Sequence, residues 1–410
     1  MNKMINPLFN KNLFSYFHRD IWLVTVIGML NWMGFSMCLP FFSLYLYQER
    51  GIPMTVIGLI ILLIGVVSAL SQVYGGMLTD KFGRKPLLVR SMFLSCITFV
   101  ILAFLINAAA PVWLLVIIFI ASYVLMTLIR PTLSTVVTDL AERDKLTKAY
   151  GLLKAGINVG WALGPAIGGY FLTIVTYEWL FGLATLTALI PLLITFFLLH
   201  ESLENIDEKD IIGIKNIGKV VKNSNFMMYI IITFLLLIGF GQMVSTLSVY
   251  SVDFAGFTTA QYGSLLTLNG IIVVLLQYPM ASITSNRPKY KVLITGSLLV
   301  FAGLITFSWV GSYTLAVLAM VMLSFGEITF SPVALSVVSD IAPKRQRGLY
   351  MGTFSLSETL GHATGPIVGG VLMDVFPKDP IFIWGGLGAF ALAAAIGFLW
   401  WGKRFYKTPI

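Results

Sequence analysis

The stretch PTLSTVVTDLAERDKLTKAYGLLKAGINVGWALGPAIGG, residues 131–169, is followed later in the chain by a related stretch, PVALSVVSDIAPKRQRGLYMGTFSLSETLGHATGPIVGG, residues 332–370. Eight positions recur with a constant offset of 201 residues: Pro131, Asp139, Gly151, Gly160, Gly164, Pro165, Gly168 and Gly169 match Pro332, Asp340, Gly352, Gly361, Gly365, Pro366, Gly369 and Gly370. A second set recurs 205 residues on, with Gly58, Gly65 and Gln72 matched by Gly263, Gly270 and Gln277. A repeat of this length indicates two copies of one structural unit.

The composition places these two copies in a membrane. Hydrophobic residues make up 58% of the 410 residues and charged residues 11%, against roughly 25% charged in a soluble domain. Twelve mostly apolar runs, each about 20 residues long, are centred near residues 33, 67, 101, 123, 161, 188, 237, 269, 301, 326, 360 and 392. We therefore expect an all-α membrane protein with twelve transmembrane helices, arranged as two six-helix bundles related by a pseudo-two-fold axis.

One long polar segment divides the apolar runs six and six. It covers residues 200–225, so the expected domains are an N-terminal bundle at 1–199, a linker at 200–225 and a C-terminal bundle at 226–410. Its mixed charge suits a cytoplasmic tether between bundles that move against each other. The remaining loops are too short for a soluble catalytic domain, and no nucleophile or metal-ligand pattern is visible, so we expect neither an enzyme nor a bound metal.

The basic residues are distributed unevenly along the chain. The sequence has 27 Lys and Arg against 18 Asp and Glu, and nearly all the basic residues lie before the first run, after the last run and in the loops that follow even-numbered runs. This is the positive-inside pattern, and it predicts a multi-pass protein of the cell membrane with both termini in the cytoplasm. We expect lipid, protons and a small-molecule substrate as partners, no nucleic acid, no cofactor beyond a proton gradient, and a monomer.

The loop between the second and third runs carries a specific motif. It reads GMLTDKFGRKP, residues 76–86, and matches the pattern G-x-x-x-D-[KR]-x-G-[RK]-[RK] at Gly76, Asp80, Lys81, Gly83, Arg84 and Lys85. On this motif the chain resembles the major facilitator superfamily, which implies the major facilitator fold. The resemblance also implies a conformational latch, in which Asp80 meets the start of the eleventh span near Arg347 and Arg84 meets Asp139 at the end of the fourth.

The fifth run carries a second motif, with small residues at helical spacing. The chain here resembles the antiporter motif of the twelve-span drug:proton antiporter branch, which it matches at Gly151, Gly160, Gly164, Pro165, Gly168 and Gly169. Plain helix packing is the alternative interpretation, because small-residue faces pack helices in many membrane proteins. The arginine that this branch carries early in the fourth span is absent, since the matching position lies near Phe119 and the nearest arginine is Arg130.

Five ionisable residues fall inside predicted spans: Arg130, Lys154, Glu327, Glu358 and His362. Charged groups in hydrocarbon are costly, so such residues are functional candidates. Glu327, Glu358 and His362 are the candidates for proton coupling, and the last two are four residues apart on one helix face.

The cations allow three interpretations. Arg130 and Lys154 either pair with the acids as an inner gate, or anchor an anionic substrate, or extend toward the cytoplasmic interface as long basic side chains do. Asn31 and Asn158 are further candidates for the cavity or the inner gate, although such amides often bond between helices.

Three functions remain open at this stage. The leading one is a proton-coupled exporter of lipophilic drugs or other small molecules that works by alternating access, and the second is a proton-coupled transporter of a polar metabolite such as a sugar or an organic anion. The third is a membrane receptor that does not transport, because fold alone does not determine function.

Overall fold

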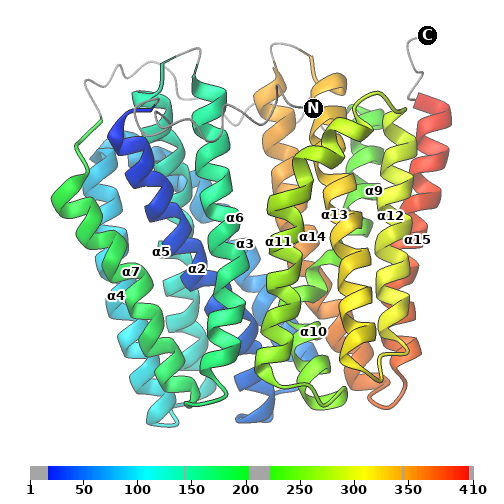
Figure 1. Cartoon of the computed structure of the whole chain (residues 1–410), viewed down its shortest axis with the longest axis horizontal. Coiled ribbons are helices and arrows are strands. Elements are labelled where there is room, and N and C mark those ends of the chain that lie inside the picture. Colours follow the sequence, from blue (N-terminus) through cyan, green and yellow to red (C-terminus); the bar gives the residue numbers. More distant parts are fainter. Residues whose placement is uncertain (1–16, 143–144, 203–221, 344–345, 406–410) are drawn as a thin grey trace. The chain divides into compact units, whose positions relative to one another are not determined.

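The computed structural model describes residues 17–142, 145–202, 222–343 and 346–405, so most of the expected linker, residues 203–221, lies outside the described part. The described chain contains twelve long helices (Figure 1). They are α2 (Arg19–Gln48), α3 (Met54–Phe82), α4 (Arg84–Asn107), α5 (Val112–Leu140), α6 (Leu146–Phe171), α7 (Tyr177–Leu198), α9 (Ser224–Phe240), α11 (Thr259–Thr284), α12 (Lys289–Phe307), α13 (Tyr313–Ile341), α14 (Arg347–Val375) and α15 (Pro380–Phe405). Three short elements follow α9: η2 (Gly241–Val244), α10 (Thr246–Val249) and η3 (Tyr250–Phe254).

Ten of these helices are long and apolar enough to cross a membrane. The two others, α6 and α14, are 26 and 29 residues long and carry the repeated glycine motif, which lowers their hydropathy. Large apolar side chains are exposed along the outside of the helices, including Phe197 at 70% and Ile283 at 69%, as expected for surfaces that contact lipid. The all-helical prediction is confirmed, with ten of the twelve long helices apolar enough to span a membrane.

Proline lies inside seven of the helices without ending them. Neighbouring helices can satisfy the backbone groups that proline frees, so membrane helices tolerate such interruptions. The residues are Pro40, Pro131, Pro165, Pro191, Pro279, Pro332 and Pro366. Pro165 and Pro366 lie at equivalent places in the repeat.

The chain divides into two compact units. Unit 1 comprises Met1–Cys38, Leu70–Gly164 and Thr176–Glu208, and unit 2 comprises Leu39–Ala69, Pro165–Val175 and Lys209–Ile410. Unit 2 therefore includes the second part of α2, the first part of α3 and the end of α6. The expected division into bundles at 1–199 and 226–410 stays a prediction.

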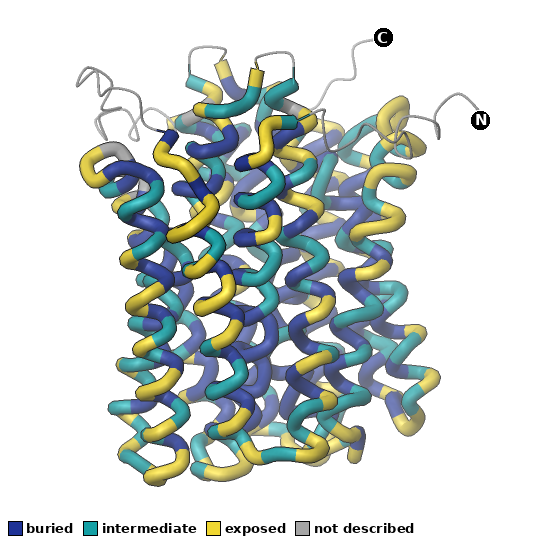
Figure 2. The backbone as a smooth tube through the Cα atoms, turned by 60° about the vertical axis from the view of Figure 1, so that its left-hand side comes forward, coloured by how far each residue is buried: buried dark blue, intermediate teal, exposed yellow. Residues whose placement is uncertain are grey.

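Within unit 1, α4 packs against both α5 and α7, and all three helices are labelled in Figure 1. The core of unit 1 contains buried aliphatic residues from α2, α4, α5 and α6, among them Val24, Leu88, Leu133 and Leu153. Figure 2 shows buried, intermediate and exposed positions alternating along the helices nearest the viewer.

Within unit 2, α12 packs against α13 and α15, while α9 packs against α14 and α15. Two buried aromatic side chains with a polar atom help to fix this arrangement through hydrogen bonds to neighbouring helices. The Tyr229 hydroxyl donates to the Ala334 carbonyl at 3.0 Å, and Trp401 Nε1 donates to Asn225 Oδ1 at 2.7 Å.

Candidate functional site

The turn between α3 and α4 is joined to the ends of α5 and α7 by charged contacts. Arg84 Nε donates to Asp139 Oδ2 at 3.0 Å, and Ser202 Oγ donates to the same oxygen at 2.9 Å. The Arg84 side chain is only 9% exposed, so salt screens this ion pair less than it would an exposed one. The structure thus brings together Arg84 and Asp139, while their role in a latch stays a prediction.

Glu201, which the sequence did not single out, completes this cluster. Its two carboxylate oxygens accept from the backbone N–H groups of Arg84 and Lys85, each at 3.1 Å. These are among the first amides of α4, which have no partner inside the helix, and a negative charge there also meets the positive end of the helix dipole. Gly83 has a φ of 85°, and a Cβ there would lie 2.9 Å from the Glu201 carboxylate. The turn therefore requires glycine.

The rest of the 76–85 motif is less fully described. Gly76 and Asp80 lie within α3, and the surroundings of both fall outside the described part of the structure. Lys81 is exposed, with its Nζ 5.5 Å from the ring of Phe82. The expected contact of Asp80 with the start of α14 stays a prediction.

In unit 1 the glycines of the fifth-span motif lie against α2. A Cβ on Gly160 would lie 2.0 Å from the Met29 carbonyl oxygen, and one on Gly164 would lie 2.4 Å from the Met33 carbonyl oxygen. Gly151, by contrast, has open space around it. Packing therefore accounts for Gly160 and Gly164 and leaves Gly151 unexplained.

The end of α6 makes an equally close contact with the start of α11, inside unit 2. Thr259 Oγ1 donates to the Gly169 carbonyl at 2.8 Å, and a Cβ on Gly169 would lie 2.3 Å from the Thr259 carbonyl oxygen. One turn further along α11, a Cβ on Gly263 would lie 2.2 Å from the Pro165 carbonyl oxygen. Gly168 beside them is buried.

The same contact occurs a second time between α3 and α14. A Cβ on Gly58 would lie 2.5 Å from the Pro366 carbonyl oxygen, and one on Gly370 would lie 2.3 Å from the Met54 carbonyl oxygen. Each pairing joins the start of one helix, α11 or α3, to the end of another, α6 or α14, near the turns at 49–53, 172–176, 255–258 and 376–379. We call these two pairings the distal contacts, and the helix ends at these turns the distal end. The repeated glycines therefore let two pairs of helix backbones approach closely.

The two distal contacts differ in how the helix start is capped. At α3, Asp374 in the last turn of α14 accepts from the backbone N–H groups of Met54 and Thr55, at 3.1 and 2.8 Å, and from Thr55 Oγ1 at 2.6 Å. At α11, the cap is local: Thr258 Oγ1 accepts from the Gln261 N–H at 3.1 Å. Only the α3 start therefore depends on a carboxylate from another helix.

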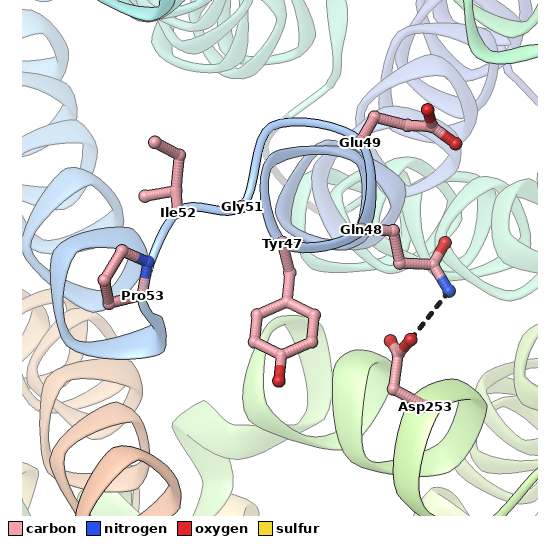
Figure 3. Close-up of a pocket in the computed structure, with 7 residues that line it drawn as sticks. All are labelled: Tyr47, Gln48, Glu49, Gly51, Ile52, Pro53 and Asp253. Carbon is pink, nitrogen blue, oxygen red and sulfur yellow. Dashed lines mark hydrogen bonds between the residues drawn. The ribbon is translucent and has the colours of Figure 1, made fainter.

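Beside the start of α3 lies an open depression of about 630 Å³ (Figure 3). Its lining is Tyr47, Gln48, Glu49, Gly51, Ile52, Pro53 and Asp253. Gln48 Nε2 donates to Asp253 Oδ1 at 3.0 Å, as the dashed line marks. Desolvation raises the pKa of Asp253 above its ordinary value, and the Gln48 hydrogen bond partly offsets that rise.

Glu327 lies near the middle of α13 and is half-buried. Its Oε2 accepts from Asn269 Nδ2 of α11 at 2.9 Å, and the same amide donates to Ser324 Oγ at 3.1 Å. Asn269 is 3% exposed. The carboxyl group is thus held by a buried amide inside a transmembrane pair of helices.

Glu358 and His362 lie one turn apart on α14. Glu358 is half-buried and the His362 side chain is exposed, with its ring centroid 6.3 Å from that of Phe240. The His362 carbonyl oxygen lies 2.3 Å from a Cβ built on Gly241. The backbone at His362 therefore packs closely against the end of α9.

The two cations are exposed in unit 1. The Arg130 guanidinium carbon lies 5.8 Å from the centre of the Trp32 ring, and Lys154 is on α6. Of the two candidate amides, Asn31 is 5% exposed and Asn158 is half-buried.

Comparison with known proteins identifies the chain's family. The model of the Major Facilitator Superfamily matches residues 24–326 and 255–409. The chain belongs to this superfamily. This confirms the resemblance found in the 76–86 loop. Members of the Major Facilitator Superfamily are transporters, so this multi-pass integral membrane protein is a transporter and not an enzyme.

The similar proteins agree with that assignment. The chain is 24% identical to a Na⁺, Li⁺, K⁺/H⁺ antiporter of Planococcus maritimus, over 92% of this chain and 94% of that protein. It is 25% identical to multidrug resistance protein 2 of Bacillus subtilis, over 78% of this chain and 80% of the relative. A crystal structure of a POT family transporter with a peptide conjugate matches 97% of this chain and 98% of that one, with a TM-score of 0.80 and 16% identity. This last likeness concerns the fold alone.

Two residues of these sites were missed by sequence reasoning. Glu201 is the first acid after the sixth apolar run, and Asp374 stands where the first copy of the repeat has Thr173. For Asp374 the sequence did hold a signal, because an acid that breaks the repeat near the end of a span marks a position with a role in only one half.

Proposed function

We propose that this superfamily member is a secondary active transporter that exports lipophilic small molecules in exchange for protons by alternating access. The observation that carries the proposal is Glu327, a half-buried carboxyl group within α13 that accepts a hydrogen bond from Asn269. A charged carboxylate in a membrane span is costly unless it is wet or partnered. Uptake and loss of a proton at Glu327 would therefore favour different conformations.

The distal contacts support alternation between two states. They depend on backbone approach at Gly58, Gly169, Gly263 and Gly370, so they are either fully made or open. We infer that the distal end faces the outside, because the basic loops of the sequence lie at the other ends of the spans. The contacts would then close the outer side while substrate enters from the cytoplasm.

The relatives favour exchange against protons. One is named as a cation/H⁺ antiporter and another as a multidrug resistance protein. In the proposed cycle, a proton from outside neutralises Glu327, the bundles rearrange, and the proton leaves to the cytoplasm. Glu358 and His362 are further proton-coupling candidates on α14.

The test uses purified protein in proteoliposomes under an imposed proton gradient, with a panel of lipophilic dyes. Glu327→Gln should abolish gradient-driven dye movement and retain dye binding. Asp340→Asn is the matched control, since Asp340 lies on the same helix but at its end, where Lys289 Nζ contacts it at 2.6 Å. Unchanged coupling in Glu327→Gln would remove Glu327 from the mechanism, and movement of no compound at all would favour the receptor alternative.

A transporter of a polar metabolite is the second candidate. The exposed cations Arg130 and Lys154 favour it, because an anionic group of a substrate could bind there.

A further inference from the structure

Three helices of unit 1 bring four aromatic rings together with a guanidinium group. Trp32 and Phe35 come from α2, Tyr123 from α5 and Trp161 from α6. The ring centroids of Trp32 and Trp161 are 6.0 Å apart, and those of Phe35 and Tyr123 are 4.5 Å apart, both in edge-to-face arrangements. The Arg130 guanidinium carbon of α5 lies 5.8 Å from the Trp32 ring centre.

This cluster has an inner side and an open side. Phe35 is 7% exposed, whereas Trp32, Tyr123 and Trp161 are half-buried and Arg130 is exposed. The cavity behind Phe35 and Tyr123 has a volume of about 10 Å³, which is at most enough for one water molecule. A larger molecule can therefore meet these rings only from the open side.

The second cation belongs to the same open side. Lys154, Asn158 and Trp161 are spaced by four and three residues on α6, so they share one helix face. A neighbouring stripe, with Gly160 and Gly164, packs on α2. Lys154 therefore lies on the face of α6 that carries Trp161. We call Trp32, Trp161, Arg130 and Lys154 the aromatic–cation surface.

Charge makes this surface unusual for a membrane-spanning region. Within the described residues neither Arg130 nor Lys154 forms an ion pair, although both lie on spanning helices. Cations at such positions mark substrate or ion pathways when they contact water or bind an anion. An arginine that lies over a tryptophan ring still has N–H donors for a carboxylate.

We propose that the aromatic–cation surface binds the transported substrate, and that this substrate is an aromatic anion. Its ring lies against Trp32 and Trp161, and its acidic group binds Arg130 and Lys154. The inference rests on the proposed function and narrows it, because two exposed cations near these aromatic rings repel cationic drugs and attract carboxylates, sulfonates or phosphates attached to an aromatic ring.

The probes are four small molecules that differ in one property each. They are 2-naphthoate, the neutral 2-naphthylmethanol, the cationic 2-naphthylmethylammonium and the non-aromatic cyclohexanecarboxylate. Binding to the full chain in lipid nanodiscs is measured by calorimetry, with no proton gradient. We expect 2-naphthoate to bind at least about tenfold more tightly than each of the other three.

Variants separate a binding role from a structural one. Arg130→Gln should weaken 2-naphthoate about tenfold and leave 2-naphthylmethanol unchanged. Trp161→Leu should weaken the binding of both 2-naphthoate and 2-naphthylmethanol, and Trp161→Phe should restore most of that loss. Lys148→Gln, an exposed lysine on another face of α6, is the matched control and should change neither.

The results distinguish this inference from the function on which it rests. Equal binding of the anionic and neutral probes, or equal weakening of all probes by Arg130→Gln, would overturn the aromatic-anion site. Proton-driven export of dyes in proteoliposomes would still stand in that case. Conversely, anion-selective binding without gradient-driven flux would support the site and refute the proton-coupled exporter.

Discussion

Removing the Asp374 carboxylate should open the distal contact between α3 and α14. The carboxylate accepts two hydrogen bonds from backbone N–H groups of α3 that have no partner inside that helix, and a third from Thr55 Oγ1. Asp374→Ala removes all three. Loss of a helix cap costs about 1 kcal/mol and loss of a further hydrogen bond about 1 kcal/mol, so the closed state should lose about 2 kcal/mol.

A milder variant isolates the charge. Asp374→Asn keeps an oxygen that can accept hydrogen bonds from the start of α3. It removes the interaction of a full negative charge with the helix dipole, which contributes about 1 kcal/mol at most to the stability of the closed state. At room temperature 2 kcal/mol corresponds to a roughly 30-fold change in the ratio of open to closed molecules, and 1 kcal/mol to a roughly fivefold change.

The assay is the accessibility of a thiol placed under the contact. Ile61 lies on α3 between Gly58 and Gly65 and is 6% exposed. Ile61→Cys, in a protein whose Cys38 and Cys96 are replaced by alanine, is treated with a membrane-impermeant maleimide from the distal side. When opening is fast compared with labelling, the labelling rate follows the population of the open state.

The expected order of labelling rates is Asp374→Ala, then Asp374→Asn, then wild type. Asp379→Asn is the control, because it removes another exposed acid, in the turn that follows α14. Labelling of Asp374→Ala within twofold of wild type, at an unchanged melting temperature, would refute the assignment of Asp374 as the cap that holds this contact closed.

Three further predictions follow from the same contacts. Glu201→Gln should destabilise the protein by about 1 kcal/mol, because two N–H groups at the start of α4 lose a charged acceptor, and thermal unfolding in detergent measures this loss. Gly263→Ala should cost 1 kcal/mol or more, since its Cβ would lie 2.2 Å from the Pro165 carbonyl oxygen, and thiol labelling at the α6–α11 contact should rise. Thr258→Ala should increase amide hydrogen exchange at the start of α11 and leave labelling of Ile61→Cys unchanged, because that cap is local.

The twelve helices were predictable from the sequence because each is a long apolar run, and the family was predictable from the 76–86 loop. The pairing of Arg84 with Asp139 was implied by the resemblance, and the structure brings the two side chains together. Glu201 and Asp374 were not predicted, since each acts on the start of a helix that is distant in sequence. The break in the repeat at Asp374 marks a position with a role in one half, but hydropathy and spacing do not identify the helix start that the acid contacts, which depends on where two helix ends meet.

The two distal contacts have equivalent glycines but different helix caps. The free energy needed to open them therefore differs. When α11 separates from α6, its first turn keeps the cap from Thr258 and Gln261, so the loss is mainly one of packing and of the bond from Thr259 to Gly169. When α3 separates from α14, its first turn also loses every bond from Asp374, and two amides must find water. The α3–α14 contact is therefore the one whose opening depends on the charge of a single carboxyl group.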